Sequence, residues 1–177
     1  MKLTTTHYII IGIIVLSLIL YFMKDKIKSA FARGLQNNNP GNIDRQVDPT
    51  TGKYMNVGDA GYQPWKGEIR SDDSRFRKFA RREDGYRAMF VNLRGYFSHG
   101  LNTIDKIVTT WAPAKDNNNT KAYIAAVAKQ TGIDPQKQLS FTDIPSIRKI
   151  VAAISQHENG VPADMDEVDS GFKILNT

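Results

Sequence analysis

The chain has 177 residues, of which 41% are hydrophobic and 24% charged, and this composition is that of an ordinary globular protein. The absence of cysteine excludes a disulfide scaffold, a thiol nucleophile and a zinc site built on thiolates. The net charge of +6 could indicate a nucleic-acid binder, but +4 of it falls within residues 1–33. The rest lacks the concentrated basic face that duplex binding needs, so no nucleic-acid partner is expected.

Residues 8–23 form an uncharged apolar run, YIIIGIIVLSLILYFM. With residues 4–7 added, a helix over this run is long enough to cross the hydrocarbon core of a bilayer. Aromatic residues near both ends favour the interface, and the basic stretch at 24–28 suits lipid headgroups. A signal peptide would need a small-residue cleavage site, and a buried core helix is seldom placed at such a terminus. The sequence therefore predicts a transmembrane helix at residues 8–23 that binds the lipid bilayer.

The predicted transmembrane helix divides the rest of the chain into a flank, a linker, one domain and a tail. A short flank at residues 1–7 precedes it, and a basic juxtamembrane linker at 24–34 follows it. One domain is predicted at residues 35–160, and an acidic tail at 161–177 either wraps that domain or frays.

The predicted domain begins with loops and continues with helices. Residues 35–75 are rich in Asn, Gly, Pro and Asp, which predicts loops with short strands. Apolar residues spaced by three and four then predict four helices. The helices run from Asp84 to His99-Gly100, from Asn102 or Thr103 to Pro113, from a Thr120 cap to Gly132, and from Asp143 or Ser146 to Asn159-Gly160. The fold class is mainly α, with a small loop-and-strand lobe.

The histidines do not form a metal site. His157-Glu158 begins like the zinc motif HExxH, but Val161 stands where the second histidine would have to be. No nucleophile elbow, phosphate-binding loop or dinucleotide fingerprint is present either. Neither a metal nor another cofactor is expected.

Three glutamates are candidates for a catalytic carboxyl. Glycoside cleavage needs a carboxyl that is protonated near neutral pH and can donate to the leaving oxygen. Glu158 fits best because it follows the apolar face of the fourth helix and lies at the negative helix end, where a charge is disfavoured. Glu83, beside two arginines at a helix start, suits a stabilising carboxylate, and Glu68 has only loop context. The alternative for Glu158 is a solvated glutamate at the end of a helix, and the alternative for Glu83 is an acid at a helix start, where the dipole favours it.

Amide and aromatic side chains in the loop region are candidates for glycan binding. Amides can hydrogen-bond the acetamido and hydroxyl groups of a sugar, and aromatic rings can stack on its faces. The alternative for the Asn-rich segment is a simple turn, and the helical spacing of Trp111 favours a core position over a sugar-stacking one. The substrate-binding candidates are Asn37, Asn38, Asn39, Asn42, Tyr62 and Trp65.

Short motifs follow one another from about residue 33 to 160. They are Gly34–Ile43 (GLQNNNPGNI), Trp65-Lys66-Gly67, Phe76–Phe79 with Gly85–Ala88, Gly100–Ile104, Trp111-Ala112-Pro113 with Asn118–Thr120, and His157-Glu158-Asn159-Gly160. In this order they closely resemble phage structural proteins of the lytic-transglycosylase or lysozyme-like kind. One departure is Asp44, where that family usually has Arg.

The resemblance implies a lysozyme-like α (α+β) fold that acts on peptidoglycan between N-acetylmuramic acid and N-acetylglucosamine. It also implies a phage virion component that opens the cell wall during genome entry. In lysozyme-like glucosaminidases the acid ends a helix in a His-Glu-Thr-Gly context, and an Asn-Asn-x-x-Gly-Ile segment follows it. Here His157–Gly160 and Asn38–Ile43 resemble these two elements in reversed order, which favours Glu158.

Two functions stay open at this point. The first is a membrane-anchored enzyme that cleaves bacterial peptidoglycan, with a lytic transglycosylase reaction preferred because only one carboxylate stands out. The second is a non-enzymatic structural or wall-binding protein at the capsid–membrane junction, with capsid or other virion membrane proteins as partners. The location expected is the membrane of a phage virion, and the alternative is the bacterial inner membrane. The charge around residues 8–23 leaves the side of the domain open.

Overall fold

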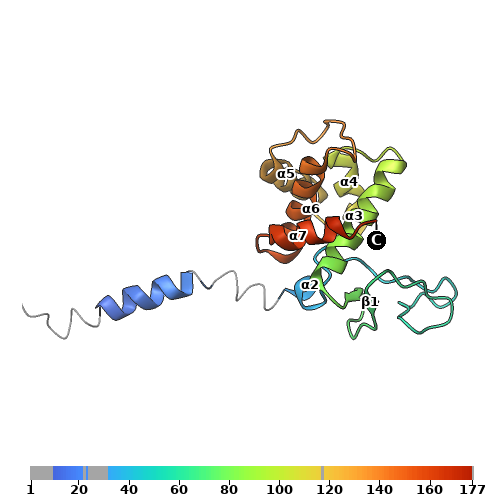
Figure 1. The fold of residues 1–177 in the computed structure, drawn as a ribbon, viewed down its shortest axis with the longest axis horizontal. Helices are drawn as coiled ribbons and strands as arrows, with labels where there is room; N and C mark the ends of the chain where they lie inside the picture. Colours follow the sequence, from blue (N-terminus) through green and yellow to red (C-terminus); the bar gives the residue numbers. More distant parts are fainter. Residues whose placement is uncertain (1–9, 22, 24–31, 117, 177) are drawn as a thin grey trace, which may run out of the picture.

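Helices dominate the computed structural model, which describes residues 10–21, 23, 32–116 and 118–176. The main body is a bundle of helices with a lobe of loops at one end (Figure 1). The elements are α2 (Arg33–Gln36), β1 (Glu68–Ile69), β2 (Lys78–Phe79), α3 (Arg82–Ser98), α4 (Ile104–Trp111), the 3-10 helix η1 (Ala114–Asp116), α5 (Thr120–Thr131), α6 (Ile144–Asn159) and α7 (Met165–Lys173). The prediction of a mainly helical protein is confirmed.

The helix ends follow from local sequence signals. The side chains of Thr103, Asn119 and Asp143 accept hydrogen bonds from backbone N–H groups in the first turns of α4, α5 and α6. At the other ends of α5 and α6, Gly132 and Gly160 adopt left-handed conformations that glycine enters without strain. The predicted starts of α4 and α6 are therefore confirmed, whereas the prediction of a Thr120 cap for α5 is wrong, because Asn119 caps that helix.

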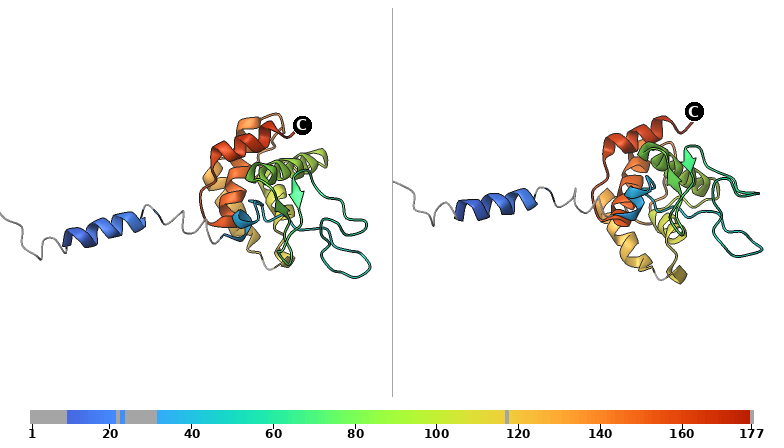
Figure 2. Two further views of the ribbon diagram at one scale, coloured as in Figure 1. Left: turned by 60° about the horizontal axis from the view of Figure 1, so that its bottom comes forward. Right: turned by 90° about the horizontal axis from the view of Figure 1, so that it is seen from below.

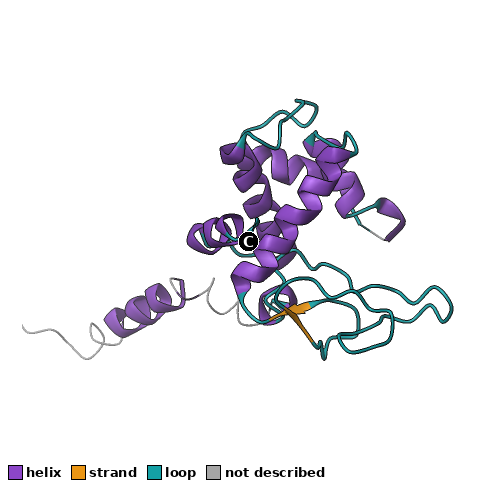
Figure 3. Ribbon diagram, turned by 45° about the vertical axis from the view of Figure 1, so that its right-hand side comes forward, coloured by secondary structure: helices purple, strands orange, loops and turns teal. Residues whose placement is uncertain are grey.

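Residues 43–80 form the loop lobe, which projects to one side of the helices (Figures 2 and 3). Its regular structure is small, since β1 and β2 pair over only two residues each, in antiparallel orientation. Isolated bridges join Asp44 to Phe76 and Val47 to Tyr54. The lobe agrees with the prediction of loops and short strands for residues 35–75.

The core is formed by buried side chains of α3, α4, α5 and α6 and is completed by α7. Val168 of α7 is fully buried, and Phe172 packs edge-on against Phe90 of α3 with ring centroids 5.3 Å apart. A Cβ atom on Gly171 would lie 2.5 Å from Cβ of Tyr86, so a glycine permits this close contact of α7 with α3. Of the tail predicted at residues 161–177, the described part, residues 161–176, therefore packs on the domain, which is one of the two outcomes that the sequence left open.

The prediction of a transmembrane helix at residues 8–23 is wrong. Residues 10–21 and 23 are helical, and residues 8, 9 and 22 lie outside the described residues. Within the part of the chain that the structure describes, no helix is long and apolar enough to cross a membrane. A helix over residues 10–21 rises about 18 Å, whereas the hydrocarbon core is roughly 30 Å thick. The expectation of a single-pass membrane protein is corrected with it.

The predicted juxtamembrane linker at 24–34 is only partly described. Residues 24–31 lie outside the described residues, and Arg33 and Gly34 already belong to α2. Arg33 donates two hydrogen bonds to the carboxylate of Asp73, at 2.5 and 2.6 Å, so α2 is fastened to the loop lobe.

Candidate functional site

Glu158 lies near the C-terminal end of α6, where this helix reaches the loop lobe. Ile147, Ile150 and Ile154 bury the preceding face of the helix, and Glu158 continues that face because it follows Ile154 by four positions. Gly160 then ends the helix. The sequence thus places a carboxyl group where the buried face of α6 meets solvent, and Glu158 is half-buried.

Two hydrogen-bond donors hold the carboxyl group of Glu158. Nδ2 of Asn42 donates to Oε2 at 3.0 Å, and the hydroxyl of Tyr123 in α5 donates to Oε1 at 2.9 Å. Burial, together with the negative charge of Glu158, raises the pKa of Tyr123, so the tyrosine keeps its proton and stays a donor. Sequence reasoning missed this residue, because its spacing marks only a buried face of α5.

His157 supports Tyr123 from the other side. Its ring stacks on that of Tyr123, with centroids 3.5 Å apart and an interplanar angle of 16°. Burial lowers the pKa of His157, although the charge of Glu158 opposes the shift. A neutral imidazole can lie flat on the phenol ring, and the stack limits rotation of the tyrosine that holds Glu158.

The Asn-rich turn supplies the other donor through an unusual backbone. Asn38 and Asn42 adopt positive φ angles of 50° and 48°, a left-handed conformation that asparagine tolerates better than other residues with side chains. Nδ2 of Asn159 also donates to the carbonyl oxygen of Pro40 at 2.8 Å. The end of α6 and the turn are therefore joined by two neighbouring hydrogen bonds, Asn42 to Glu158 and Asn159 to Pro40.

The other three predicted amides bond within the protein. Asn37 donates to the carboxylate of Asp73 at 2.9 Å, and Asn38 donates to the carbonyl oxygens of Phe79 and Ala80. Asn39 is fully buried and bonds the backbone of Ile43 and Arg77 with both ends of its amide. These three asparagines hold the turn against the loop lobe, so Asn42 is the member of the set that reaches Glu158.

Glycines allow the turn to approach its neighbours closely. A Cβ atom on Gly41 would lie 2.6 Å from Cζ2 of Trp111. One on Gly34 would lie 2.6 Å from Oδ1 of Asn159 and 2.7 Å from Oδ1 of Asn42. Side chains at either position would push apart the groups that surround Glu158.

A cleft runs beside Glu158 between the turn, the loop lobe and the end of α4. It consists of two neighbouring cavities of about 130 and 170 Å³. The walls common to both cavities are formed by Gly41, Asn42, Arg75 and Trp111. The smaller cavity also contains Glu158, Asp116 and Asn118, and the larger one contains Asn92, Tyr96 and Asp44.

Trp111 and Arg75 are an aromatic and a charged side chain in the wall of the cleft. Trp111 is half-buried and packs edge-on against Tyr96, with centroids 6.4 Å apart, so it belongs to both the core margin and the cleft wall. Arg75 makes two hydrogen bonds to the carboxylate of Asp44, at 2.7 and 2.8 Å. These bonds raise the pKa of Arg75. The wall of the cleft therefore contains the ion pair of Arg75 and Asp44.

The remaining predicted residues lie elsewhere. Glu68 is buried and accepts hydrogen bonds from Tyr62, from the backbone of Trp65 at 2.8 Å and from Arg77 at 2.5 Å. Tyr62 is itself buried, and Trp65 packs under the guanidinium of Arg77. All three therefore belong to the interior packing of the loop lobe.

Glu83 also has a partner away from the cleft. Its carboxylate pairs with Arg81 at 3.0 Å, and its carbonyl oxygen faces Gly171 of α7. Among the residues described, no group of three or more His, Cys, Asp or Glu side chains could hold a metal ion.

No protein-family model matches the chain. Protein P5 of Pseudoalteromonas phage PM2 is 36% identical to it over 145 residues, which cover 80% of this chain and 81% of the phage protein. The chain belongs to the family of protein P5 of Pseudoalteromonas phage PM2.

Proposed function

We propose that this protein cleaves the glycan of bacterial peptidoglycan, between N-acetylmuramic acid and N-acetylglucosamine, with Glu158 as the general acid. The observation that carries the proposal is the position of Glu158: a half-buried carboxyl group, opening into a cleft and held by the neutral donors Asn42 and Tyr123. A general acid must be oriented toward the leaving oxygen and must be able to hold a proton.

The other two glutamates suit this role less well. An arginine partner favours the charged form of a carboxyl group, and Glu68 and Glu83 are paired with Arg77 and Arg81. Glu158 has no ion-pair partner among the residues that the structure describes. Among these residues, its carboxyl group is therefore held by the neutral donors Asn42 and Tyr123 alone.

The cleft suits a polar sugar polymer. The ring of Trp111 offers a stacking face, while Asn92 and Asn118 offer amides for acetamido and hydroxyl groups. Arg75 lines both cavities as well, with its guanidinium paired to Asp44. A chain of sugars can extend through both neighbouring cavities.

The phage relative supports a role at the bacterial envelope. A phage must pass the cell wall to deliver its genome, and local cleavage of the glycan opens a path. We therefore place the activity in the virion, at the stage of genome entry.

Digestion of purified peptidoglycan by the full chain tests the proposal. Soluble muropeptides should appear with the wild-type protein, and Glu158→Gln should reduce their rate of release by roughly two to four orders of magnitude, because it removes the transferable proton but keeps the shape. Circular dichroism should show the same helix content for both proteins. A wild-type protein that sediments with peptidoglycan and releases nothing would instead support the non-enzymatic wall-binding alternative.

A further inference from the structure

Asp116 brings a second carboxylate to the cavity that contains Glu158. The two residues come from different elements, since Asp116 ends η1 after α4 and Glu158 lies near the end of α6. Both line the same cavity of about 130 Å³, together with Arg75 and Asn118. Both acidic residues therefore belong to the lining of one cavity beside the cleft wall.

The loop that carries Asp116 is fastened at several points. Its backbone N–H donates to the carbonyl oxygen of Pro113 at 3.0 Å, and Nδ2 of Asn118 donates to the same oxygen at 3.2 Å. The hydroxyl of Thr120 donates to the carbonyl oxygen of Ala112 at 2.7 Å. Asp116 is thus presented from a turn that is bonded to the end of α4.

The carboxylate of Asp116 is open to solvent. It is exposed, and it has no hydrogen bond or ion pair with any residue that the structure describes. The pKa of Arg75 is raised mainly by its hydrogen bonds to Asp44, and the negative charge of Asp116 adds a smaller effect in the same direction. The carboxylate is therefore close enough to Arg75 for their charges to interact, and it can bond a water molecule.

We propose that Asp116 is the general base of a hydrolytic reaction, an inference that rests on the proposed function. The bond between the anomeric carbon and the glycosidic oxygen breaks, and Glu158 gives its proton to that oxygen. The oxygen of a water molecule bonds to the anomeric carbon, and Asp116 takes the proton that this water loses. Exchange with solvent then returns a proton to Glu158 and removes one from Asp116.

The cavity leaves room for water as the attacking group. A water molecule occupies about 30 Å³ in the liquid, so a cavity of about 130 Å³ that is lined by both Glu158 and Asp116 can hold one. Enzymes in which a carboxylate activates water keep their two carboxyl groups far enough apart to admit it, and they invert the anomeric configuration. A lytic transglycosylase needs no such base, because the attacking hydroxyl belongs to the substrate. The sequence favoured that reaction because it made only one carboxylate stand out.

The test is a digestion of peptidoglycan by the full chain in heavy-oxygen water. Products of the wild-type protein should carry one added water at the new reducing end, with its oxygen taken from solvent, as read by mass spectrometry. Asp116→Asn should lower the rate by roughly two to four orders of magnitude. Azide is a nucleophile that needs no general base, because it has no proton to lose. Added azide should therefore restore glycan cleavage by the Asp116→Ala variant, with a glycosyl azide as the product. It should not restore cleavage by the Glu158→Gln variant, which lacks the general acid.

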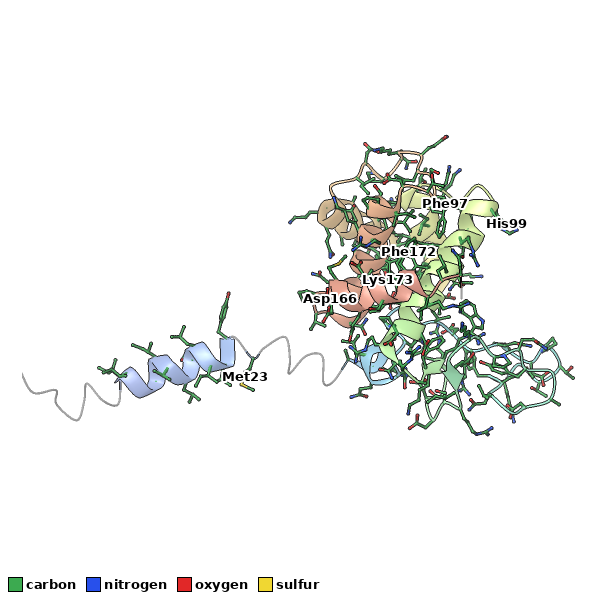
Figure 4. All side chains as sticks on the ribbon, viewed as in Figure 1. Met23, Phe97, His99, Asp166, Phe172 and Lys173 are labelled. Carbon is green, nitrogen blue, oxygen red and sulfur yellow. The ribbon has the colours of Figure 1, made fainter. Side chains whose placement is uncertain are left out.

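The matched control is Asp166→Asn on α7, an exposed aspartate that lies outside the cleft (Figure 4) and should cleave like the wild type. Anhydro products, or an Asp116→Asn variant as active as this control, would overturn the role of Asp116 and leave glycan cleavage standing. A folded Asp116→Ala variant that stays inactive with azide would overturn it as well. A wild-type protein that releases no product would remove both the proposed function and this inference.

Discussion

The hydroxyl of Tyr123 donates a hydrogen bond of 2.9 Å to Glu158, and this contact joins α5 to α6 at the edge of the cleft. Asn42 reaches the other carboxylate oxygen from the Asn-rich turn. Three segments far apart in the chain therefore meet at one carboxyl group. Each of the contacts that hold it can be removed separately.

Tyr123→Phe should lower the rate of glycan cleavage about ten- to a hundred-fold. The substitution keeps the ring stacked on His157 but removes a hydrogen bond to a charged group, worth about 1.5–3 kcal/mol. The effect should fall on kcat more than on KM, because the hydroxyl positions the acid. Tyr86→Phe is the matched control, since it removes a buried hydroxyl that bonds Ser155 instead. Equal rates for the two variants would contradict a positioning role for Tyr123.

Gly41→Ala should weaken both folding and glycan binding. The new methyl group would lie 2.6 Å from Trp111 and 3.0 Å from Met89, so the indole must move from the cleft wall. Overpacking of this kind costs about 1–3 kcal/mol in the free energy of unfolding. Thermal melting and titration of tryptophan fluorescence with chito-oligosaccharides measure the two effects.

Gly95→Ala is the control for that experiment. Gly95 lies within α3, and a Cβ atom there would meet nothing within 4 Å. Alanine is the better helix former, so stability should rise by about 0.5–1 kcal/mol, with glycan binding unchanged. A Gly41→Ala protein with the melting temperature and glycan affinity of the wild type would contradict this prediction, because it would show that the Trp111 indole can move without a cost in stability or binding.

Glu68→Gln should destabilise the protein and leave the activity of the folded fraction intact. The side chain of Glu68 is 0% exposed and that of its partner Arg77 is 8% exposed, so the substitution leaves a buried guanidinium without its counter-charge. Breaking such a pair costs about 3–5 kcal/mol. Urea denaturation measures the loss. Glu83→Gln should cost roughly 0–1 kcal/mol, because its partner Arg81 is 60% exposed. A stable but inactive Glu68→Gln protein would return Glu68 to the list of catalytic candidates.

Asp73 should make the loop lobe sensitive to acid. Burial by itself would raise the pKa of Asp73, but hydrogen bonds from Arg33, from the backbone of Phe76 and Arg75, and from Asn37 hold it well below its usual range. A lowered pKa stabilises the folded state fully above the unfolded value of about 3.9. This contribution is lost progressively as the pH falls from there toward the folded value.

Asp73→Asn should therefore lower the free energy of unfolding by about 1–3 kcal/mol at neutral pH. The difference from wild type should shrink as the pH falls below about 4. Thermal melts between neutral and acidic pH measure it. Asp72→Asn is the neighbouring control, because that side chain is 82% exposed and its loss should change little. A pH-independent gap between Asp73→Asn and wild type would contradict the role given to its charge.

The sequence by itself determined the helices α3 to α6 and most of their ends, whereas α7 lies in the tail, where no helix was predicted. Caps such as Thr103 and Asp143, stop signals such as Gly132 and Gly160, and apolar spacing act over a few residues, and the structure follows them. They also put Glu158 at the end of the buried face of α6. By contrast, the apolar run at 8–23 was misread, since hydrophobicity along a run does not fix the length of the helix that forms there.

Only the tertiary structure decided which side chains surround Glu158. Asn42 is 116 positions away from it in the chain and Tyr123 is 35 positions away, so neither contact leaves a periodic pattern. The same holds for Asp116, which in the sequence is one aspartate in a polar loop and in the fold lines the cavity of Glu158. Caps and turns are set by interactions between neighbouring residues, whereas a site is assembled by the packing of whole helices, and the orientation of α5 against α6 is a property of their shared core.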